Sequence, residues 1–461
     1  IKAYIFPSLR PTPMLSFALR ELGCTAGVVV TASHNPPQYN GYKVYWEDGA
    51  QITAPKDKQI ITEVQAITDF AQVKTMSEED AKAAGLYEVI GEEIDDKYME
   101  ALKKLVLRPE AIKEQADKLK SVYTPLHGTG NIPVRRVLKE LGFNNVYVVK
   151  EQELPDGNFP TVSYPNPEDK NAFTLALKLA AEVDADIVLA TDPDADRLGI
   201  YAKNEKTGEY ESFTGNMSGM LILEYLLSQR KELGMLPENG AVVTTIVSGK
   251  MARAIAKEYN VELIETLTGF KYIGEQIKFF EQNHDHEFLF GYEESYGCLE
   301  GTHARDKDAV VAVMALCEAA AYYKSKGITL CEQMQNLYQK YGFYKESLFF
   351  QTFQGMEGKA KIDGLMDALR NQPPKQVGPF KVTALEDYKK SVRTDIATGE
   401  TSALTLPESN VLYFELEDGA WFCVRPSGTE PKIKYYAGVK GADAQDATDK
   451  LEALSKAVVE L

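Results

Sequence analysis

Residues 186–197 read Asp-Ile-Val-Leu-Ala-Thr-Asp-Pro-Asp-Ala-Asp-Arg, and this stretch decides the fold. Its first half is an apolar run that predicts a buried strand over 186–190. Its second half, residues 191–197, is a polar loop that directly follows the strand. Ligands of open α/β sheets bind beyond the carboxyl ends of the strands, so we expect this loop to be functional.

The same order of apolar strand, polar loop and amphipathic helix occurs three times along the chain, which is typical of parallel α/β units. The three copies end in the polar loops 31–36, 191–197 and 291–295, and these loops could face one cleft. The expected strands are 3–6, 27–31, 120–124, 146–149, 186–190, 241–246, 261–265 and 287–290, and the expected helices are 12–22, 132–141, 172–182, 250–258 and 272–282.

The part of the chain after residue 340 has a different pattern and predicts a smaller α+β domain. Residues 411–415 and 421–424 are typical of a hairpin, and a terminal helix follows them. A charged helical segment at 77–107 is expected to link the first two units. The chain is long enough for three or four domains. We expect four, over residues 1–115, 116–213, 214–340 and 341–461.

Composition excludes several classes of function. The 461 residues carry a net charge of −17, which repels a polyanion and argues against nucleic acid, although basic loops could bind a small anion. The longest apolar stretch, 309–323, contains Glu318 and is too short to span a bilayer, so no membrane partner is expected. Five scattered cysteines indicate a reducing, cytoplasmic compartment. The chain begins at Ile1 and enters a strand at once, so we expect its native start to be missing.

Three aspartates alternate in the loop 191–197. Asp192, Asp194 and Asp196 place hard oxygen donors close together, which is costly unless a cation neutralises them, and Mg²⁺ is the preferred ligand. An EF-hand is excluded because its sixth and twelfth positions would be Arg197 and Lys203 instead of Gly and Glu. A phosphatase with an aspartyl nucleophile and a solvated turn remain as alternatives.

A second candidate lies in the loop 31–36, Thr-Ala-Ser-His-Asn-Pro. Small neighbours and a following proline should leave the Ser33 hydroxyl exposed at the end of a strand. No Gly-x-Ser-x-Gly elbow is present to indicate a hydrolase. Lys43 follows a turn and could reach the same cleft, whereas the simpler interpretations are a structural serine and a solvated lysine.

Further polar segments could bind an anionic sugar. Residues 425–432 combine a guanidinium, hydroxyls and backbone donors, which suits a phosphate dianion, although such a loop is often an ordinary polar turn. The basic segments 268–271 and 303–308 could bind an anion or form surface ion pairs. Glu293 and Ser295 could bind sugar hydroxyls. Adjacent carboxylates cannot readily flank a sugar ring, which disfavours glycoside hydrolysis.

Four motifs occur in the order found in the α-D-phosphohexomutase superfamily. They are Thr-Ala-Ser-His-Asn-Pro around Ser33, Asp-Pro-Asp-Ala-Asp-Arg around Asp194, Gly-Tyr-Glu-Glu-Ser around Glu293 and Arg-Pro-Ser-Gly-Thr-Glu-Pro from Arg425. The chain resembles this superfamily over essentially its whole length, in the branch that contains phosphoglucomutases, phosphomannomutases and phosphopentomutases. The family normally begins with a further segment that bears an Arg-containing loop, and this sequence starts after it.

The resemblance implies a heart-shaped protein of four domains, three of them similar mixed α/β domains, with the first domain lacking its N-terminal part. Each domain would supply one loop to a central cleft. The implied catalytic residues are Ser33 as a phosphoserine, Lys43 for proton transfer, His34 and Arg197. Ser33 and the three aspartates would hold Mg²⁺. The implied substrate-binding residues are Gly269, Lys271, Glu293, Ser295, His303, Lys307, Arg425, Ser427, Gly428 and Thr429.

The implied reaction interconverts glucose 1-phosphate and glucose 6-phosphate through a glucose 1,6-bisphosphate intermediate, which would also act as activator. The Glu-x-Ser pattern at Glu293 resembles the family's grip on glucose or mannose. Tyr292 stands where many phosphoglucomutases have glycine and resembles the phosphopentomutase branch instead. Pentose and mannose phosphates, a phosphatase and a non-catalytic sugar-phosphate sensor therefore stay open, in a protein expected to be a monomer or a homodimer.

Overall fold

The computed structural model describes residues 1–353, 356–427 and 432–461. The chain divides into two compact units, described separately below. The four domain boundaries expected from the sequence stay a prediction. The first unit comprises Ile1–Thr244, Tyr259–Ile264 and Gly269–Gln333, and the second comprises Thr245–Glu258, Glu265–Thr268 and Met334–Leu461.

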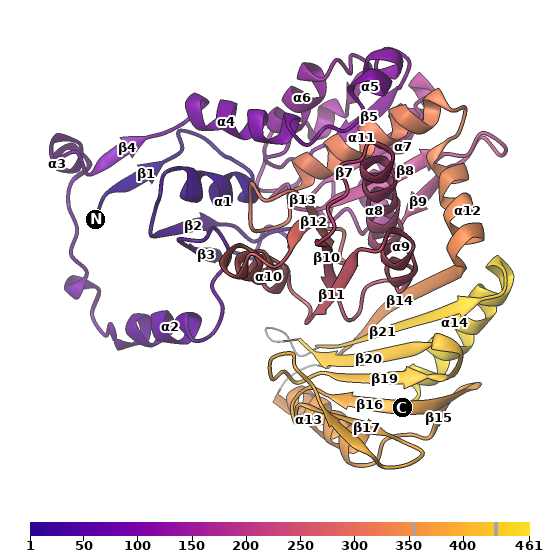
Figure 1. Cartoon of the computed structure of the whole chain (residues 1–461). Helices are drawn as coiled ribbons and strands as arrows, with labels where there is room; N and C mark the ends of the chain where they lie inside the picture. The colour runs from indigo at the N-terminus through magenta and orange to yellow at the C-terminus, as the bar shows by residue number, and fades with distance from the viewer. Residues whose placement is uncertain (354–355, 428–431) are drawn as a thin grey trace. The chain divides into compact units, whose positions relative to one another are not determined.

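The N-terminal region contains two small sheets, where the sequence predicted one parallel unit (Figure 1). β1 (Ala3–Ile5) pairs in parallel with β4 (Tyr87–Val89), whereas β2 (Ala26–Val30) pairs antiparallel with β3 (Tyr42–Trp46). The expected helix between β1 and β2 is α1 (Thr12–Glu21), which has a proline in its first turn, where the missing N–H costs nothing. The other helices of this region are α2 (Lys56–Ala66), η1 (Phe70–Gln72) and α5 (Pro109–Gln115).

The charged segment 77–107 is not a continuous helical link. It forms α3 (Glu78–Ala83), then the strand β4, then α4 (Glu92–Lys103). The helical prediction was therefore wrong for β4, because a three-residue strand is too short to show an alternation of polar and apolar residues. β4 extends the sheet of β1.

A five-stranded mixed sheet carries the aspartate loop. Its order is β6-β5-β7-β8-β9; β6, β5 and β7 run parallel, and β8 and β9 add antiparallel strands. β7 is buried along its whole length, as its apolar run predicted. The elements are β5 (Ser121–Thr124), α6 (Asn131–Glu140), β6 (Val146–Val148), η2 (Lys150–Gln152), η3 (Lys170–Phe173), α7 (Thr174–Val183), β7 (Ile187–Thr191), β8 (Leu198–Lys203) and β9 (Tyr210–Phe213).

A four-stranded sheet of order β11-β10-β12-β13 carries the loop after residue 290, and β12 runs parallel to β10. The apolar stretch 309–323 lies in α11, which is buried on nearly all sides. No helix in the described ranges is long and apolar enough to cross a membrane. The elements are α8 (Gly215–Glu232), β10 (Gly240–Thr245), α9 (Met251–Tyr259), β11 (Glu262–Thr266), α10 (Phe270–Asn283), β12 (Glu287–Tyr292), β13 (Cys298–Glu300), α11 (Ala309–Ser325) and α12 (Leu330–Tyr341).

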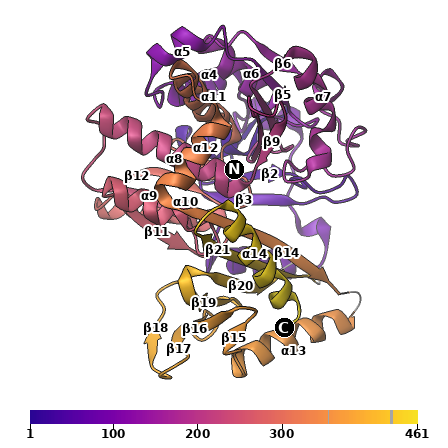
Figure 2. The same ribbon diagram turned by 90° about the vertical axis from the view of Figure 1, so that its right-hand side faces the viewer.

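The second unit is built on one mainly antiparallel sheet, whose described strands follow the order β14-β21-β20-β19-β16-β17-β18. The predicted hairpin is confirmed as β19 and β20, and the terminal helix α14 packs along β14 and β21 (Figure 2). The elements are β14 (Phe343–Thr352), α13 (Met356–Asn371), β15 (Gln376–Val377), β16 (Phe380–Asp387), β17 (Val392–Asp395), β18 (Thr401–Ala403), β19 (Leu412–Leu416), η4 (Glu417–Gly419), β20 (Trp421–Pro426), β21 (Lys432–Gly441) and α14 (Ala444–Val459).

Candidate functional site

Three polar loops of the first unit follow β2, β7 and β12, as the sequence predicted. Each loop holds one non-glycine residue in the left-handed backbone region: Ser33 at φ 56°, Ala195 at φ 50° and Tyr296 at φ 68°. Such a conformation costs about 1–3 kcal/mol per residue and persists where the surrounding structure imposes it, often at functional sites. Each of the three loops identified by the sequence pattern thus contains such a residue, a conformation that eight other non-glycine residues of the described ranges also adopt.

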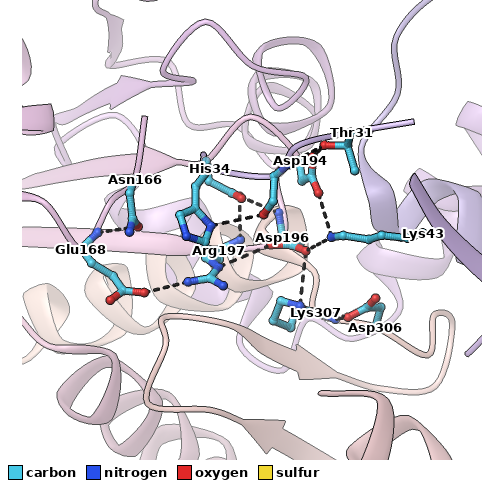
Figure 3. Close-up of polar contacts among 12 residues, drawn as sticks. Thr31, His34, Lys43, Asn166, Glu168, Asp194, Asp196, Arg197, Asp306 and Lys307 are labelled. Carbon is cyan, nitrogen blue, oxygen red and sulfur yellow. Dashed lines mark hydrogen bonds and ion pairs between the residues drawn. The ribbon is translucent and has the colours of Figure 1, made fainter. Parts of the chain in front are cut away.

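Thr31 joins the serine loop to the aspartate loop. Its hydroxyl accepts a hydrogen bond from the Ser33 backbone N–H at 2.8 Å and donates one to Asp194 Oδ1. Thr31 and Asp194 are 163 residues apart in the chain, and Figure 3 shows them side by side. The Ser33 hydroxyl therefore lies on a loop whose position is fixed by the aspartate loop.

The three aspartates are almost completely buried. Asp192, Asp194 and Asp196 are 0%, 5% and 1% exposed. Asp192 Oδ1 accepts hydrogen bonds from the backbone N–H groups of Asp196 and Arg197, both at 3.0 Å, and so closes the loop on itself. The turn brings all three carboxyl groups into the region beyond the end of β7.

Two lysines neutralise part of this buried negative charge. Lys43 Nζ lies 2.8 Å from Asp194 Oδ2 and 3.3 Å from Asp196 Oδ2, and Lys307 Nζ lies 3.3 Å from the same oxygen of Asp196 (Figure 3). Lys307 also contacts Asp306 at 3.2 Å. Burial opposes the charge on both lysines, but the neighbouring carboxylates outweigh it and raise their pKa. Burial likewise opposes ionisation of Asp196, and the cations still lower its pKa.

The carboxyl groups retain unused oxygens. Within the described residues, Asp192 Oδ2 and Asp196 Oδ1 are buried without a hydrogen-bond partner, which is costly unless a cation binds there. In the same residues no three His, Cys, Asp or Glu side chains converge into a ready metal cage, and the Lys43 ammonium contacts both Asp194 and Asp196. The donor set of hard oxygens nevertheless fits Mg²⁺.

His34 stays neutral at physiological pH. Burial, together with the nearby positive charge of Arg197, lowers the pKa of His34 to about 3. Its Nδ1 lies 3.2 Å from Ser33 Oγ, and its ring packs edge-on against Tyr164. A neutral imidazole can orient the serine hydroxyl by a hydrogen bond, but it cannot offer the proton of an imidazolium.

The loop after β12 contains Glu293 and Ser295, both expected to bind the sugar, and Glu293 contacts Gly269. Glu293 is 4% exposed, and its Oε1 accepts a hydrogen bond from the Gly269 N–H at 2.8 Å. Burial raises the pKa of the Glu293 carboxyl, although Lys307 counteracts it. Ser295 is partly exposed in the same loop. Gly269 has φ 126°, a conformation that few other residues adopt.

Two other predicted residues lie in different surroundings. The His303 side chain is 5% exposed, and its Nε2 lies 2.8 Å from Asp308 Oδ2, an oxygen that also accepts a hydrogen bond from Tyr98. Because Asp308 caps the start of α11, His303 supports the fold at this position. Lys271 lines a cavity of about 200 Å³ beside Lys278.

The predicted phosphate loop belongs to the second unit. Arg425 lies near the end of β20, and the Ser427 N–H donates a hydrogen bond to the Lys432 carbonyl at 2.7 Å. Gly428 and Thr429 lie outside the described residues. The predicted roles of these four residues stay predictions.

Sequence reasoning missed Glu168. It forms an ion pair with Arg197 at 2.7 Å and lies in a proline-containing loop 29 residues earlier in the chain. Asp306 lies in the basic segment 303–308 and was not singled out by sequence, yet it accepts a hydrogen bond from Tyr45 and contacts Lys307. Neither carboxylate has a local signal in the sequence, because only the fold brings each to its partner.

Four family models match the chain, all described as phosphoglucomutase/phosphomannomutase. Domain I matches residues 1–70, domain II 96–207, domain III 214–341 and the C-terminal domain 372–454. A phosphoglucomutase of Staphylococcus epidermidis is 40% identical over 95% of this chain and 78% of its own length. A phosphoglucomutase of Staphylococcus aureus is 38% identical over 98% of this chain and 80% of its own.

Solved structures show the same fold. A putative phosphomannomutase from Thermus thermophilus superposes with a TM-score of 0.70 at 21% identity. The superposition covers 100% of this chain and 83% of the other chain. The open form of parafusin, a phosphoglucomutase from Paramecium, superposes with a TM-score of 0.66 at 18% identity, over 99% and 81% of the two chains.

Proposed function

The chain belongs to the phosphoglucomutase/phosphomannomutase family, and from this premise we propose that it interconverts glucose 1-phosphate and glucose 6-phosphate through a phosphoserine at Ser33. The reaction is an isomerisation by phosphoryl transfer. The phosphorylated serine gives its phosphoryl group to the free hydroxyl of the sugar monophosphate, and the resulting glucose 1,6-bisphosphate returns its other phosphoryl group to Ser33. Added glucose 1,6-bisphosphate would therefore activate the enzyme by phosphorylating Ser33.

The observation that carries this proposal is the bridge formed by Thr31. One hydroxyl binds the Ser33 backbone and the Asp194 carboxylate, so the serine loop is held against a cluster of three buried aspartates. A structural serine in a surface loop needs no such neighbour. A serine that carries a phosphoryl group needs charged groups held close to it, because phosphoryl transfer depends mainly on positioning and on the stabilisation of charge.

Different side chains are proposed to stabilise charge, to transfer the proton and to orient Ser33. Lys307 and Arg197 offset the charge that spreads over the phosphoryl oxygens. Lys43 is the candidate for proton transfer at the reacting sugar oxygen: when glucose 1,6-bisphosphate returns a phosphoryl group to Ser33, the Ser33 hydroxyl loses a proton and the sugar oxygen gains one, which the Lys43 ammonium can supply. His34 orients the Ser33 hydroxyl by a hydrogen bond.

Asp192, Asp194, Asp196 and the oxygen of Ser33 would hold Mg²⁺. The ion would supply positive charge next to the transferred phosphoryl group. The buried and unpartnered oxygens of Asp192 and Asp196 support this assignment, and Lys43 Nζ must withdraw from between the carboxylates for the ion to bind.

The sugar and its second phosphate require groups outside this cluster. Glu293 and Ser295 are proposed to bind sugar hydroxyls, with Gly269 fixing the Glu293 carboxylate through its N–H. Lys271 and His303 are proposed only as outer contacts of the sugar site. Arg425, Ser427, Gly428 and Thr429 are proposed to bind the phosphate that does not react.

The test is the conversion of glucose 1-phosphate to glucose 6-phosphate with Mg²⁺ and catalytic glucose 1,6-bisphosphate, coupled to the reduction of NADP⁺ by glucose-6-phosphate dehydrogenase. Wild type is compared with Ser33→Ala and with Ser8→Ala, which alters an exposed serine. We expect turnover in wild type and Ser8→Ala and none above background in Ser33→Ala. Intact mass after incubation with the bisphosphate should show one added phosphoryl group only where Ser33 is present.

Parallel assays with mannose 1-phosphate and ribose 1-phosphate test the choice of sugar. Faster turnover of either one would replace glucose as the substrate and leave the phosphoserine in place. Release of inorganic phosphate by both wild type and Ser33→Ala would contradict the mutase reaction and favour an aspartyl nucleophile.

A further inference from the structure

Arg197 is held by a carboxylate that belongs to none of the four motifs. Glu168 Oε1 accepts a hydrogen bond from Arg197 Nη1 at 2.7 Å, and the two side chains are 28% and 17% exposed. Figure 3 shows the guanidinium between Glu168 on one side and Asp196 on the other. In the described residues Glu168 is the one side chain hydrogen-bonded to this guanidinium, whereas Arg197 Nε is buried without a partner.

Glu168 is itself fixed by its loop. Its backbone N–H donates a hydrogen bond to Asn166 Oδ1 at 3.0 Å, which closes a tight turn. The preceding Pro167 packs directly on β8, since a Cβ added to Gly199 would lie 2.7 Å from Pro167 Cβ and 2.8 Å from its carbonyl oxygen. The carboxylate therefore stands on a backbone that packs against the strand following Arg197.

This arrangement keeps the contact between Arg197 and the aspartates long. Arg197 Nε lies 3.9 Å from Asp196 Oδ1, an ion pair that is too long for a hydrogen bond, although a guanidinium and a buried carboxylate attract each other. The closer ion pair with Glu168, at 2.7 Å on the other side of the guanidinium, opposes that attraction. Asp196 Oδ1 stays available for a cation, and Arg197 Nε stays available for an anion.

We propose that Glu168 is a positioning residue that holds the Arg197 guanidinium off Asp196 and directs it at the phosphoryl group carried by Ser33. This inference rests on the proposed function, because it needs a phosphoserine as the anion. Glu168 touches neither substrate nor metal and acts only through Arg197.

The kinetic test compares Glu168→Ala and Glu168→Gln with Glu153→Gln. Glu153 is a matched control because it is 29% exposed and pairs with Arg135 at 2.5 Å outside the site. We expect kcat to fall by about 10- to 100-fold in Glu168→Ala, the loss typical of a misplaced catalytic group, while KM changes less than about twofold. Glu168→Gln keeps a hydrogen-bond acceptor but loses the negative charge, so its kcat should lie between those of wild type and Glu168→Ala. Glu153→Gln should match wild type.

A double-mutant cycle with Arg197→Ala separates positioning from a general loss of stability. If Glu168 acts only through Arg197, Glu168→Ala causes no further loss of kcat in the Arg197→Ala background. Independent, multiplying losses would overturn the proposal.

A readout without turnover keeps this test apart from the proposed function. In protein labelled with ¹⁵N-arginine, the Nε–H resonance that disappears in Arg197→Ala belongs to Arg197. We expect it to shift and broaden in Glu168→Ala but not in Glu153→Gln. An unchanged resonance would overturn the proposal, whereas a shifted resonance in a chain that lacks mutase activity would contradict the proposed function alone.

Discussion

Gly128 lies against the aspartate loop without contributing a side chain to it, and Gly128→Ala should therefore disable the site indirectly. A Cβ at this position would lie 2.4 Å from Pro193 Cα and 2.9 Å from the carbonyl oxygens of Pro125 and Pro193. All three atoms are backbone atoms, so no side chain can rotate away. Ordinary contact begins near 3.4 Å, and the two backbones must separate by about 1 Å.

The neighbouring contacts transmit this displacement to the carboxylates. Thr129 N–H and its hydroxyl both donate hydrogen bonds to the Pro193 carbonyl, at 2.9 and 2.8 Å, and Pro193 stands between Asp192 and Asp194. Misplacement of catalytic groups by 1 Å can cost about 100-fold in rate. Overpacking typically costs about 1–3 kcal/mol of stability, which lowers the melting temperature by several degrees.

The assay is the coupled conversion of glucose 1-phosphate, with melting temperature measured on the same samples. Gly157→Ala is the control, because nothing lies within 4 Å of its added Cβ. We expect Gly128→Ala to lose on the order of 100-fold in kcat and Gly157→Ala to match wild type. Equal kcat and equal melting temperature in the two variants would refute the claim that the loop 191–197 is held by backbone contact with Gly128.

Three further predictions concern charge in the first unit. Lys43→Met removes the ammonium between two buried carboxylates and should cost about 3–5 kcal/mol of stability without Mg²⁺; added Mg²⁺ should raise its melting temperature more than that of wild type. Tyr45→Phe deletes a buried 2.6 Å hydrogen bond to Asp306 and should lower the free energy of unfolding by about 1–3 kcal/mol in a denaturant titration. Burial raises the pKa of Glu300 to about 8, despite Arg230 nearby, so the folded chain keeps a proton that the unfolded chain releases above about pH 4.3. The contribution of Glu300 to stability therefore falls as pH rises from about 4 to 8, and the melting temperature of wild type relative to that of Glu300→Gln should fall between pH 5 and 8.

The sequence was informative where structure depends on local pattern. β7 is an uninterrupted apolar run that ends in a polar loop, and the structure has the strand and the loop at the predicted positions. The hairpin of β19 and β20 was equally visible, because both strands are apolar and a short turn separates them. β4 was not predicted because its three residues lie between two charged helices. The feature that identifies it as a strand is its pairing with β1, which the sequence does not show.

The site was predictable as a set of loops but not as a set of contacts. The pairs Thr31–Asp194 and Lys43–Asp194 join residues 163 and 151 positions apart, and no spacing rule connects them. The resemblance implies that His303 binds the substrate, which stays a prediction, whereas no spacing rule indicated that its Nε2 lies 2.8 Å from the buried carboxylate of Asp308. Residue type indicated the chemistry, and tertiary packing decided which partner each side chain meets.

The balance of charge in the site couples the metal to the phosphate. The described loops gather more carboxylates than cations, since Glu168, Glu293 and Asp306 add to the three aspartates, whereas Lys43, Lys307 and Arg197 oppose them. A phosphate carries about −1.5 to −2 charges at neutral pH, so its entry alone would add to an existing excess of negative charge. Mg²⁺ would reduce that excess. On the proposed function, each of the two ligands therefore raises the affinity for the other, and a chain of net charge −17 can bind an anionic sugar without a broadly basic surface.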